Sequence, residues 1–238
     1  MYVDTLQDYV SKSSYIVFFG GAGVSTESGI PDFRSVDGLY NQAWKYPPEV
    51  MISHSFFAKQ TSEFFDFYRN KLLCLDAQPN KAHIALAALE KAGKLKAVIT
   101  QNIDGLHQKA GSKNVLELHG SIWRNYCLEC GDAHTTEAIA NAVAVPHCRC
   151  SGVIKPDIVL YEESLDEDIM QAAMEHITCA DMLIIGGTSL GVYPAAGLLD
   201  VYNGKRLVLI NKTATHMDKM ADLIIRDNIG DALSCFIK

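Results

Sequence analysis

Short apolar runs rich in β-branched residues alternate along this chain with amphipathic stretches of helical length. The runs have the length and composition of buried parallel strands and occupy residues 15–19, 95–100, 115–118, 182–185 and 207–210. Helical patterns alternate with them, at residues 4–11, 82–92, 168–179 and 193–202. Strands that alternate with helices predict an α/β fold, a Rossmann-like, doubly wound parallel sheet.

Two segments interrupt this alternation, and we expect them to form a smaller lobe. Residues 38–77 carry an aromatic-rich, helical insert, and residues 124–152 carry four of the seven cysteines. The large lobe is then assembled from residues 1–37, 78–123 and 153–238. A chain of 238 residues is long enough for one domain with a small second lobe, and the cleft between lobe and sheet is the predicted active site.

The charge balance and the apolar segments exclude some function classes. A net charge of −7 gives no counterion release on a polyanion, so nucleic acid is not expected as a direct partner, whereas basic peptides are attracted. No segment approaches the ~20 uncharged apolar residues of a membrane span, and residues 1–10 do not read as a signal peptide. We therefore expect a cytoplasmic protein that does not associate with a membrane. Nothing in the sequence indicates an oligomeric state.

Four cysteines fall into two pairs with the spacing of a metal site. Cys127 and Cys130 are separated by two residues, Cys148 and Cys150 by one, and 17 residues lie between the pairs. Four thiolates in this arrangement predict one closed, structural zinc ion per chain. The second pair is tighter than the common two-residue gap, so His147 stays open as a substitute ligand. Free or redox-active thiols are the other alternative.

The loop after the first predicted strand is rich in glycine. Gly21 and Gly23 allow the backbone to approach a pyrophosphate, with the amides at the start of a following helix facing the anion. Thr26 stands where the third glycine of the G-x-G-x-x-G pattern belongs. The pattern alone leaves a nucleotide site and a tight strand-to-helix turn as alternatives.

Several ordered motifs make the chain similar to a known family. They are Gly-Ala-Gly-Val-Ser-Thr-Glu-Ser-Gly-Ile-Pro-Asp-Phe-Arg-Ser at residues 21–35, Thr-Gln-Asn-Ile-Asp-Gly-Leu-His at 100–107, Leu-His-Gly at 118–120, Gly-Thr-Ser-Leu at 187–190 and Ile-Asn at 210–211. Over residues 10–234 the chain resembles the sirtuins, NAD-dependent protein-lysine deacylases, and in particular the small bacterial-type members. The resemblance implies one catalytic domain over residues 1–238. Because the family includes members with such a shortened second cysteine pair, the resemblance favours four cysteine thiolates, and not His147, as the zinc ligands.

The resemblance implies a co-substrate, NAD, and the residues that bind it. His119 and Asn102 are the implied catalytic residues. Asn and Asp side chains can hydrogen-bond ribose hydroxyls and a carboxamide, Ile103 and Phe33 can wall the nicotinamide, and Arg34 can reach phosphate. The implied NAD-binding residues are Gly21, Ala22, Thr26, Asp32, Phe33, Arg34, Gln101, Asn102, Ile103, Asp104, His119, Gly187, Thr188, Ser189, Asn211, Asp231 and Ala232.

The reaction is implied by the resemblance as well. The carbonyl oxygen of an acylated lysine attacks the nicotinamide ribose and expels nicotinamide, His119 acts as general base on the ribose hydroxyls, and water releases lysine and O-acyl-ADP-ribose. An imidazole suits this role because its unperturbed pKa of ~6.5 leaves it largely neutral at working pH. No acidic residue has the ribose-clamp spacing of a dehydrogenase, so we expect NAD to be consumed. His107 is interpreted as structural or cofactor-adjacent, and nicotinamide as a product inhibitor.

The segment implied to bind acylated-lysine proteins or peptides departs from the family pattern. Residues 155–163 read Lys-Pro-Asp-Ile-Val-Leu-Tyr-Glu-Glu and stand for a Val-x-Phe-Gly-Glu-like strand that pairs with the substrate backbone. Val159, Leu160 and Tyr161 are the implied peptide-binding residues. Glu162 replaces the glycine, where its charge would favour basic peptides.

The acyl preference is inferred from the helical insert. Relatives that remove acidic acyl groups carry Tyr-x-x-Arg there, and residues 68–71 of this chain read Tyr-Arg-Asn-Lys. Lysine lacks the planar fork that matches a carboxylate, so we expect neutral short acyl groups. A solvated face of an amphipathic helix is the alternative interpretation of this run.

Two other functions use the same motifs. A mono-ADP-ribosyltransferase would move ADP-ribose to a protein side chain, and His119 together with the full-length channel segment favours deacylation instead. A non-enzymatic NAD sensor or a zinc-stabilised interaction module needs neither His119 nor Asn102, and both are present. The sequence therefore favours an enzyme that removes acetyl or other short acyl groups from protein lysines.

Overall fold

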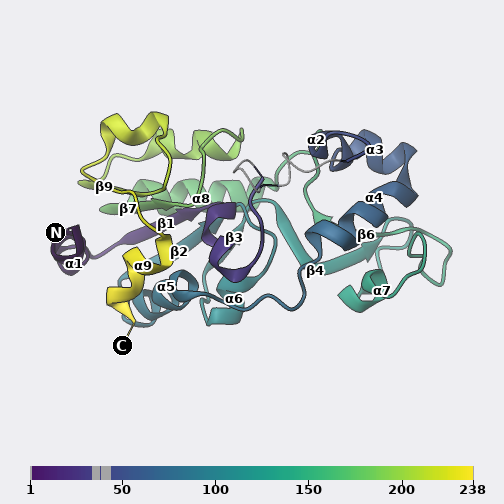
Figure 1. Ribbon diagram of the computed structural model, residues 1–238, viewed down its shortest axis with the longest axis horizontal. Helices are drawn as coiled ribbons and strands as arrows, with labels where there is room; N and C mark the ends of the chain where they lie inside the picture. Colours follow the sequence, from purple (N-terminus) through teal and green to yellow (C-terminus); the bar gives the residue numbers. More distant parts are fainter. Residues whose placement is uncertain (1, 34–37, 39–43, 238) are drawn as a thin grey trace.

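The chain folds into two lobes, a large one built on a parallel sheet and a smaller one built on an antiparallel sheet (Figure 1). The computed structural model describes residues 2–33, 38 and 44–237. Neighbouring strands of the large sheet run parallel in the order β3-β2-β1-β7-β8-β9. The strands are β1 (Ile16–Gly20), β2 (Leu95–Thr100), β3 (Val115–Glu117), β7 (Met182–Gly186), β8 (Arg206–Ile210) and β9 (Leu223–Ile225). The predicted Rossmann-like sheet is confirmed, and its five predicted strands lie within one residue of the observed bounds.

Helices cover both faces of the large sheet, and the strand side chains alternate between them. Ile16 and Phe18 of β1 pack in one core, whereas Val17 and Phe19 pack in the other. The first face is covered by α1 (Tyr2–Lys12), α5 (Lys81–Lys91) and α9 (Ile229–Leu233), and the second by α8 (Glu167–Cys179) and the 3₁₀ helices η5 (Ala195–Val201) and η6 (His216–Met220). Burial on both sides explains why each strand is a continuous apolar run in the sequence.

The start of α5 is tied to the glycine-rich loop. The Asn80 side chain accepts a hydrogen bond from the Ala82 N–H (2.8 Å), which caps the helix. Its amide donates to the Val24 carbonyl (2.8 Å) and to the Ser28 hydroxyl (3.0 Å). Two short helices, α6 (Leu106–Ala110) and η7 (Ser234–Phe236), pack beside α5. The loop after β1 is therefore held against a regular helix of the large lobe.

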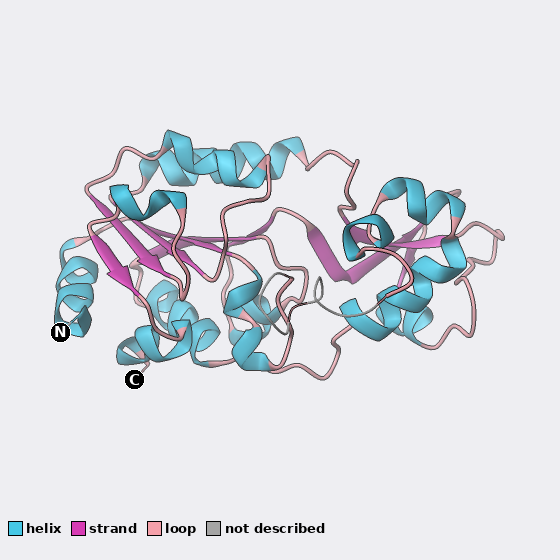
Figure 2. Cartoon of the chain, turned by 45° about the horizontal axis from the view of Figure 1, so that its top comes forward, coloured by secondary structure: helices cyan, strands magenta, loops and turns pink. Residues whose placement is uncertain are grey.

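The smaller lobe joins an antiparallel sheet to the aromatic insert (Figure 2). Its elements are β4 (Gly120–Cys127), β5 (Ala133–His134), β6 (Ile154–Ile158), α7 (Thr136–Ala140), α2 (Pro48–Met51), α3 (His54–Lys59), α4 (Thr61–Phe67) and the π-helical turn η4 (Tyr68–Leu72). Phe57, Phe64 and Phe65 meet edge to face, with ring centroids 4.9, 5.3 and 6.0 Å apart. The described part of the insert is helical, as the sequence predicts.

Three details differ from the sequence-based expectations or add to them. The helix predicted at residues 193–202 is the 3₁₀ helix η5 (Ala195–Val201) rather than an α-helix, and it follows a cis Tyr193–Pro194 bond. β9 is an edge strand of three residues, which is too short to stand out as an apolar run. The lobe boundaries proposed from the sequence fall inside β4 and just before β6.

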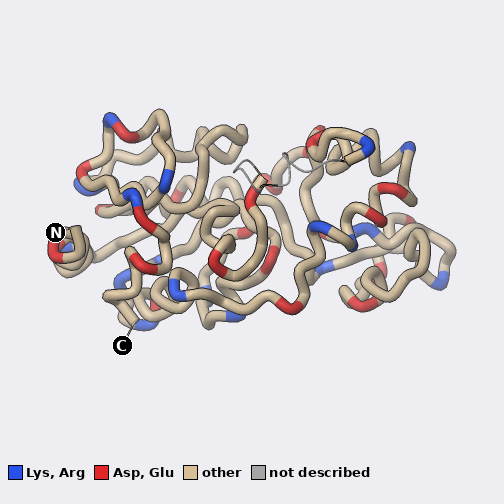
Figure 3. The backbone as a smooth tube through the Cα atoms, viewed as in Figure 1, with Lys and Arg blue, Asp and Glu red and all other residues tan. Residues whose placement is uncertain are grey.

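Charge is spread over the whole molecule. Basic and acidic positions are interspersed over both lobes, so the net charge of −7 is not confined to one segment (Figure 3). No helix in the described part of the chain is long and apolar enough to cross a membrane.

Candidate active site

A cavity of about 750 Å³ lies between the lobes, at the carboxyl edge of the large sheet. Its walls come from the segments that follow β1, β2, β3, β7, β8 and β9, and from the segment that follows β6. The volume lies within the ~300–1,000 Å³ typical of small-molecule and cofactor sites. Open α/β sheets bind their ligands at this edge, where the loops after several strands converge.

Most of the predicted site residues line this cavity. They are Gly21, Ala22, Thr26, Asp32, Phe33, Gln101, Asn102, Ile103, Asp104, His119, Val159, Leu160, Tyr161, Gly187, Thr188, Ser189 and Asn211. Asp231 and Ala232 do not line it. Asp231 pairs with Lys81 (Oδ1–Nζ 3.0 Å), and Ala232 is fully buried in the core under the sheet. Arg34 lies outside the described residues.

Other residues around the start of α9 do line the cavity. Asp227, Asn228 and Ile229 line the cavity, because they follow β9 directly at the carboxyl edge of the sheet. The later residues of α9 are turned into the core instead. Recognition of β9 in the sequence would have indicated Asn228 as a residue of the cavity wall.

The loop after β1 needs glycine because it packs against the loop after β7. The Gly23 N–H donates to the Gly187 carbonyl (2.8 Å), and a Cβ on Gly23 would lie 2.7 Å from the Gly187 Cα. Gly187 itself has φ +61°, in the left-handed region. The helix expected after this loop is wrong, since the chain makes two 3₁₀ turns, η1 (Ala22–Val24) and η2 (Thr26–Ser28).

Three polar side chains form a buried hydrogen-bond chain in the cavity wall. The Ser25 hydroxyl donates to Asp104 Oδ2 (2.6 Å) and accepts from the Asn102 side-chain amide (3.0 Å). Asp104 Oδ1 accepts from the Leu106 N–H (2.9 Å), and its carbonyl accepts from Trp123 Nε1 (2.8 Å). These bonds hold Asn102 and Asp104 in one orientation relative to the glycine-rich loop.

Ser25 and Glu27 belong to the wall but are absent from the predicted site. Ser25 is 1% exposed, and its signal in the sequence is its position two residues after Gly23 in the loop motif. The Glu27 carboxylate accepts from the Gly230 N–H (2.8 Å) and so ties η2 to α9. Both residues join segments far apart in the chain, which local sequence patterns do not reveal.

His119 lies between β3 and β4, half-buried in the cavity wall. Its Nδ1 is 2.9 Å from the Gln101 carbonyl oxygen. Because a carbonyl oxygen only accepts, Nδ1 carries the hydrogen and Nε2 keeps its lone pair. Burial lowers the pKa of His119, and the hydrogen bond to Gln101 opposes that shift. The imidazole is therefore neutral at neutral pH.

The glycine after His119 has a structural reason. Gly120 has φ +76°, and a Cβ there would overlap the Asp157 carbonyl oxygen of β6. The His119 carbonyl also accepts from the Val159 N–H (3.0 Å). His119 is thus connected directly to the segment predicted to bind peptide.

His83 and His107 form a buried pair outside the cavity wall. Their ring centroids are 4.7 Å apart, and they are 0% and 1% exposed. Neither ring nitrogen of His107 has a hydrogen-bond partner among the described residues. Burial lowers the pKa of His83 to about 4 and that of His107 to about 3. Of these three histidines, His119 lines the cavity, whereas His83 and His107 do not.

The segment predicted to bind peptide is already hydrogen-bonded inside the protein. Besides the Val159 N–H, the Leu160 N–H donates to Glu163 Oε2 (2.9 Å) and the Tyr161 N–H to the Ile52 carbonyl (3.0 Å). A peptide that adds to this segment must therefore donate its own N–H groups to carbonyl oxygens of the segment.

The run at residues 68–71 is only partly solvated. Tyr68 is fully buried, its pKa is raised by burial, and its hydroxyl has no hydrogen-bond partner in the described part of the chain. Lys71 lines the cavity, and its ammonium lies 5.0 Å from the centre of the Trp44 ring. This end of the cavity therefore carries a cation above an aromatic face.

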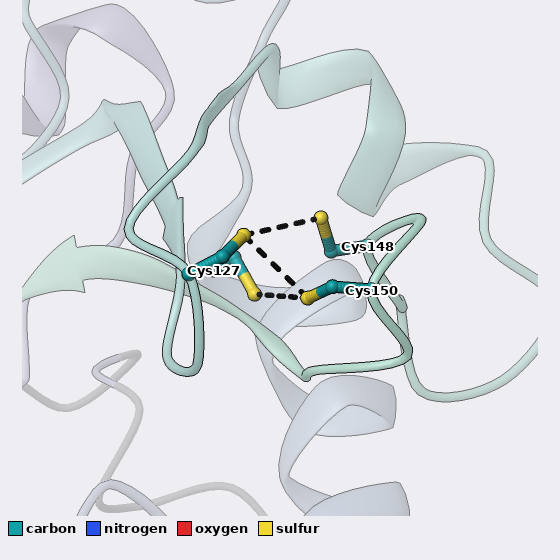
Figure 4. A group of neighbouring side chains, drawn as sticks. Cys127, Cys148 and Cys150 are labelled. Carbon is teal, nitrogen blue, oxygen red and sulfur yellow. Dashed lines mark hydrogen bonds between the residues drawn. The ribbon is translucent and has the colours of Figure 1, made fainter.

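The four clustered cysteines converge at one point of the smaller lobe (Figure 4). The Sγ atoms of Cys127 and Cys150 are 3.4 Å apart, those of Cys130 and Cys150 3.5 Å, and those of Cys130 and Cys148 3.7 Å. Sulfur atoms at ~2.3 Å from a tetrahedral zinc lie about 3.8 Å apart, and disulfide sulfurs only ~2.05 Å. The separations fit a structural zinc site with four thiolates.

The shortened second pair reaches this point through a tight turn. The Cys148 N–H donates to the Gly152 carbonyl (2.8 Å) and the Ser151 N–H to the Cys148 carbonyl (2.9 Å), with Ser151 at φ +73°. His147 is not in the cluster, and its Nδ1 lies 2.9 Å from the Ser151 carbonyl oxygen. The one-residue gap therefore needs no histidine ligand.

Comparison with known proteins agrees with these features. The pattern that defines the Sir2 family matches residues 21–194. A protein of Clostridium acetobutylicum described as an NAD-dependent protein deacetylase is 57% identical over 99% of this chain and 98% of its own length. One of Cutibacterium acnes with the same description is 54% identical over 97% of this chain and 96% of its own length.

Solved structures of Sir2 proteins match almost the whole chain. One holds a deacetylated p53 peptide and 3′-O-acetyl-ADP-ribose; it has a TM-score of 0.91 and 38% identity and covers 98% of this chain and 96% of its own. Another, with a p53 peptide and NAD⁺, has a TM-score of 0.88 and 38% identity over the same shares.

Proposed function

The chain belongs to the Sir2 family, and we propose that it removes acetyl or other short acyl groups from protein lysines and consumes NAD in doing so. One observation carries the proposal: a single cavity brings together His119, the Ser25–Asn102–Asp104 chain and the glycine-rich loop. The relatives named NAD-dependent protein deacetylase, and the similar structures that hold NAD⁺ or an acetyl-ADP-ribose with a p53 peptide, support it.

The side chains around the cavity fit NAD. Asn102, Asp104 and Asn211 offer donors and acceptors for ribose hydroxyls and a carboxamide, while Ile103 and Phe33 offer apolar walls. When bound, NAD supplies the ribose carbon that loses nicotinamide and takes up the acyl oxygen. The Ser25–Asn102–Asp104 chain orients its side chains before any ligand arrives, because all three are buried and bonded to one another. We propose nicotinamide as a product inhibitor at the same walls.

His119 is the proposed general base, and it acts through Nε2. The hydrogen bond from Nδ1 to the Gln101 carbonyl leaves Nε2 to accept a proton from a ribose hydroxyl. Because burial lowers its pKa, the neutral form persists below the ~6.5 of a free imidazole. The rate should therefore fall only as the pH drops below that value, since protonation removes the lone pair that the base uses.

Val159, Leu160 and Tyr161 are the proposed peptide-binding residues. They line the cavity, and Val159 is bonded to the carbonyl of His119. A peptide lying along them would bring its acylated lysine past the base. We favour neutral short acyl groups, because Lys71 supplies a single ammonium that already lies against Trp44. A succinyl-lysine peptide turned over faster than the acetyl-lysine peptide would contradict this preference.

The proposed zinc has a structural role. The cysteine cluster shares the core of the smaller lobe, through Cys127 and Cys148, with Ile154 and Ile158 of β6, which leads into the peptide segment. Zinc bound there would hold β4 and β6 together without contact to NAD. A cytoplasmic location is also proposed, because reduced thiols persist in reducing compartments.

The decisive experiment is incubation of the protein with an acetyl-lysine peptide, with and without NAD, followed by mass spectrometry. Deacetylated peptide and O-acetyl-ADP-ribose should appear only with NAD. Transfer of ADP-ribose onto protein, with the peptide still acetylated, would instead show an ADP-ribosyltransferase. NAD binding without any product would indicate a sensor.

A further inference from the structure

Glu162 has a backbone conformation that favours glycine. Its φ is +76°, and it shares the left-handed region with only two other non-glycine residues in the described part of the chain. It stands directly after the peptide segment, at the position that the Val-x-Phe-Gly-Glu-like pattern gives to glycine. A glutamate that keeps this conformation needs interactions that compensate for the strain.

The carboxylate of Glu162 supplies such interactions. Its Oε2 accepts from the Ser55 N–H (2.8 Å) and from the Ser55 hydroxyl (2.5 Å). These hydrogen bonds, with the charges of His54 and Lys59, lower the pKa of Glu162. The negative charge is therefore directed at the start of α3 and partly balanced there.

The residues on either side of Glu162 are joined to the same place. The Tyr161 N–H donates to the Ile52 carbonyl (3.0 Å), and the Tyr161 carbonyl accepts from the His54 N–H (2.9 Å). Glu163 bonds His54 Nδ1 through Oε1 (2.9 Å), and its Oε2 lies 3.2 Å from the buried Lys155 ammonium. Three consecutive residues thus attach the end of the peptide segment to the α2–α3 turn.

We propose that Glu162 is a positioning residue for the peptide substrate, which fastens the segment Val159–Leu160–Tyr161 to Ser55 and so holds it in shape for the peptide. This inference rests on the proposed function of that segment. It replaces the expectation that the charge of Glu162 favours basic peptides. A carboxylate that accepts two hydrogen bonds from Ser55 is less available to a basic side chain of the substrate.

The proposal distinguishes hydrogen bonding from charge, and two variants separate them. Glu162→Gln keeps a side-chain oxygen that can accept from Ser55 but removes the charge, whereas Glu162→Ala removes both. We expect Glu162→Ala to raise the KM for an acetyl-lysine peptide about 5- to 20-fold, with the KM for NAD unchanged and kcat within about twofold. Glu162→Gln should stay within about threefold of the wild type, and Ser55→Ala should lie between the two.

Each variant is measured with two acetyl-lysine peptides, one with arginines beside the modified lysine and one with serines. If Glu162 positions the segment, Glu162→Ala raises the KM for both peptides by a similar factor. A raised peptide KM in Glu162→Gln that is confined to the arginine peptide would overturn the proposal. It would instead support the expectation that the charge of Glu162 favours basic peptides. An unchanged peptide KM in Glu162→Ala would overturn it as well.

Two controls keep this outcome separate from folding and from the proposed function. Glu162→Gly removes the carboxylate but relieves the left-handed strain, so a raised peptide KM in this variant cannot come from strain. Its thermal unfolding should match the wild type within a few degrees. Absence of NAD-dependent deacetylation in the wild type would reject the proposed function itself. An active wild type whose Glu162 variants keep the wild-type peptide KM would reject only this inference.

Discussion

The two lobes hold their cores together by different means. Both cores of the large lobe arise from regular alternation along buried strands, with Ile16 and Phe18 on one side of β1 and Val17 and Phe19 on the other. The core of the smaller lobe is an aromatic cluster that also includes Cys127 and Cys148. Its sheet contains a strand of only two residues. We infer that the large lobe folds by apolar burial, whereas the smaller lobe also depends on its metal.

The proposed chemistry is divided in the same way. The large lobe supplies His119, Asn102 and Asp104 at the ends of its strands, and the smaller lobe supplies the anchor of the peptide segment at Ser55. Substitutions in the two lobes should therefore affect different measurable quantities. The large lobe should control the chemical step, and the smaller lobe should control metal content, local order and peptide affinity.

The largest effect on turnover is expected from His119→Ala. Loss of a general base should lower kcat by about 10²–10⁴-fold. The fold of both lobes and the zinc content should not change, because the ring is at the cavity wall and its Nδ1 contacts a backbone carbonyl. Deacetylation rates with zinc analysis and circular dichroism test this. Near-normal turnover would remove His119 from the mechanism.

A smaller loss of activity, with a large loss of order, is expected from Cys148→Ala. Removal of one thiolate should release zinc and loosen residues 124–152, while the large sheet stays folded. Activity should fall at least about tenfold because β6 leads into the peptide segment. Zinc analysis and limited proteolysis show where the chain opens.

The neighbouring His147→Ala is the matched control for this variant. It should keep its zinc, because His147 bonds Ser151 and lies outside the cluster. Loss of zinc from His147→Ala, or a purified protein without zinc, would contradict the four-thiolate site. Proteolytic cleavage within the large sheet of Cys148→Ala would contradict the inference that only the smaller lobe depends on the metal.

A further tenfold effect is expected from the chain of polar side chains at the cavity. Asp104→Asn replaces the acceptor of the Ser25 hydroxyl and should lower kcat/KM for NAD about tenfold and weaken inhibition by nicotinamide. Ser25→Ala should act in the same direction. Since the two residues share one bond, the double variant should lose less than the product of the single losses. Losses that multiply strictly would show that the two residues act independently. Unchanged nicotinamide inhibition in Asp104→Asn would place the nicotinamide pocket elsewhere.

The smallest expected effect is on acid stability. The unfolded chain protonates His83 and His107 below pH ~6.5, whereas the folded chain does so only near pH 4 and 3, so a falling pH favours unfolding in this window. His107→Asn should flatten the dependence of Tm on pH between 6.5 and 4.5. His216→Asn, at an exposed histidine, is the control and should leave that slope unchanged. An unaltered slope in His107→Asn would show that the pair does not set it.

The contrast between the lobes also explains what the sequence could predict. Strands buried on both faces are continuous apolar runs, so five of the six large-sheet strands could be located within one residue. β9 could not, because Leu223–Ile225 is a three-residue run between Asp222 and Arg226. The small sheet could not be predicted either. β5 has only two residues, β4 includes the exposed Trp123 and Arg124, and the core of this lobe depends on aromatic contacts and on cysteines brought together by the fold.

At the site, the sequence motifs predict which residues line the cavity but not the hydrogen bonds between them. The protonated nitrogen of His119 depends on Gln101, 18 residues earlier in the chain. Asn228 lines the cavity and Asp231 does not, because α9 begins at Ile229, and a sequence fixes helix starts poorly. The role of Glu162 depends on a left-handed backbone and on Ser55, 107 residues away. Such long-range hydrogen bonds have no local signature.

The most direct test follows the acyl group itself. A peptide with ¹³C-acetyl-lysine is incubated with the zinc-loaded protein and NAD, and nicotinamide, deacetylated peptide and labelled O-acetyl-ADP-ribose are quantified by mass spectrometry at early times. We expect the three products in equal amounts, with the ¹³C label on ADP-ribose. Labelled free acetate formed without NAD, or nicotinamide released with no transfer of the label, would contradict NAD-consuming deacylation at this cavity.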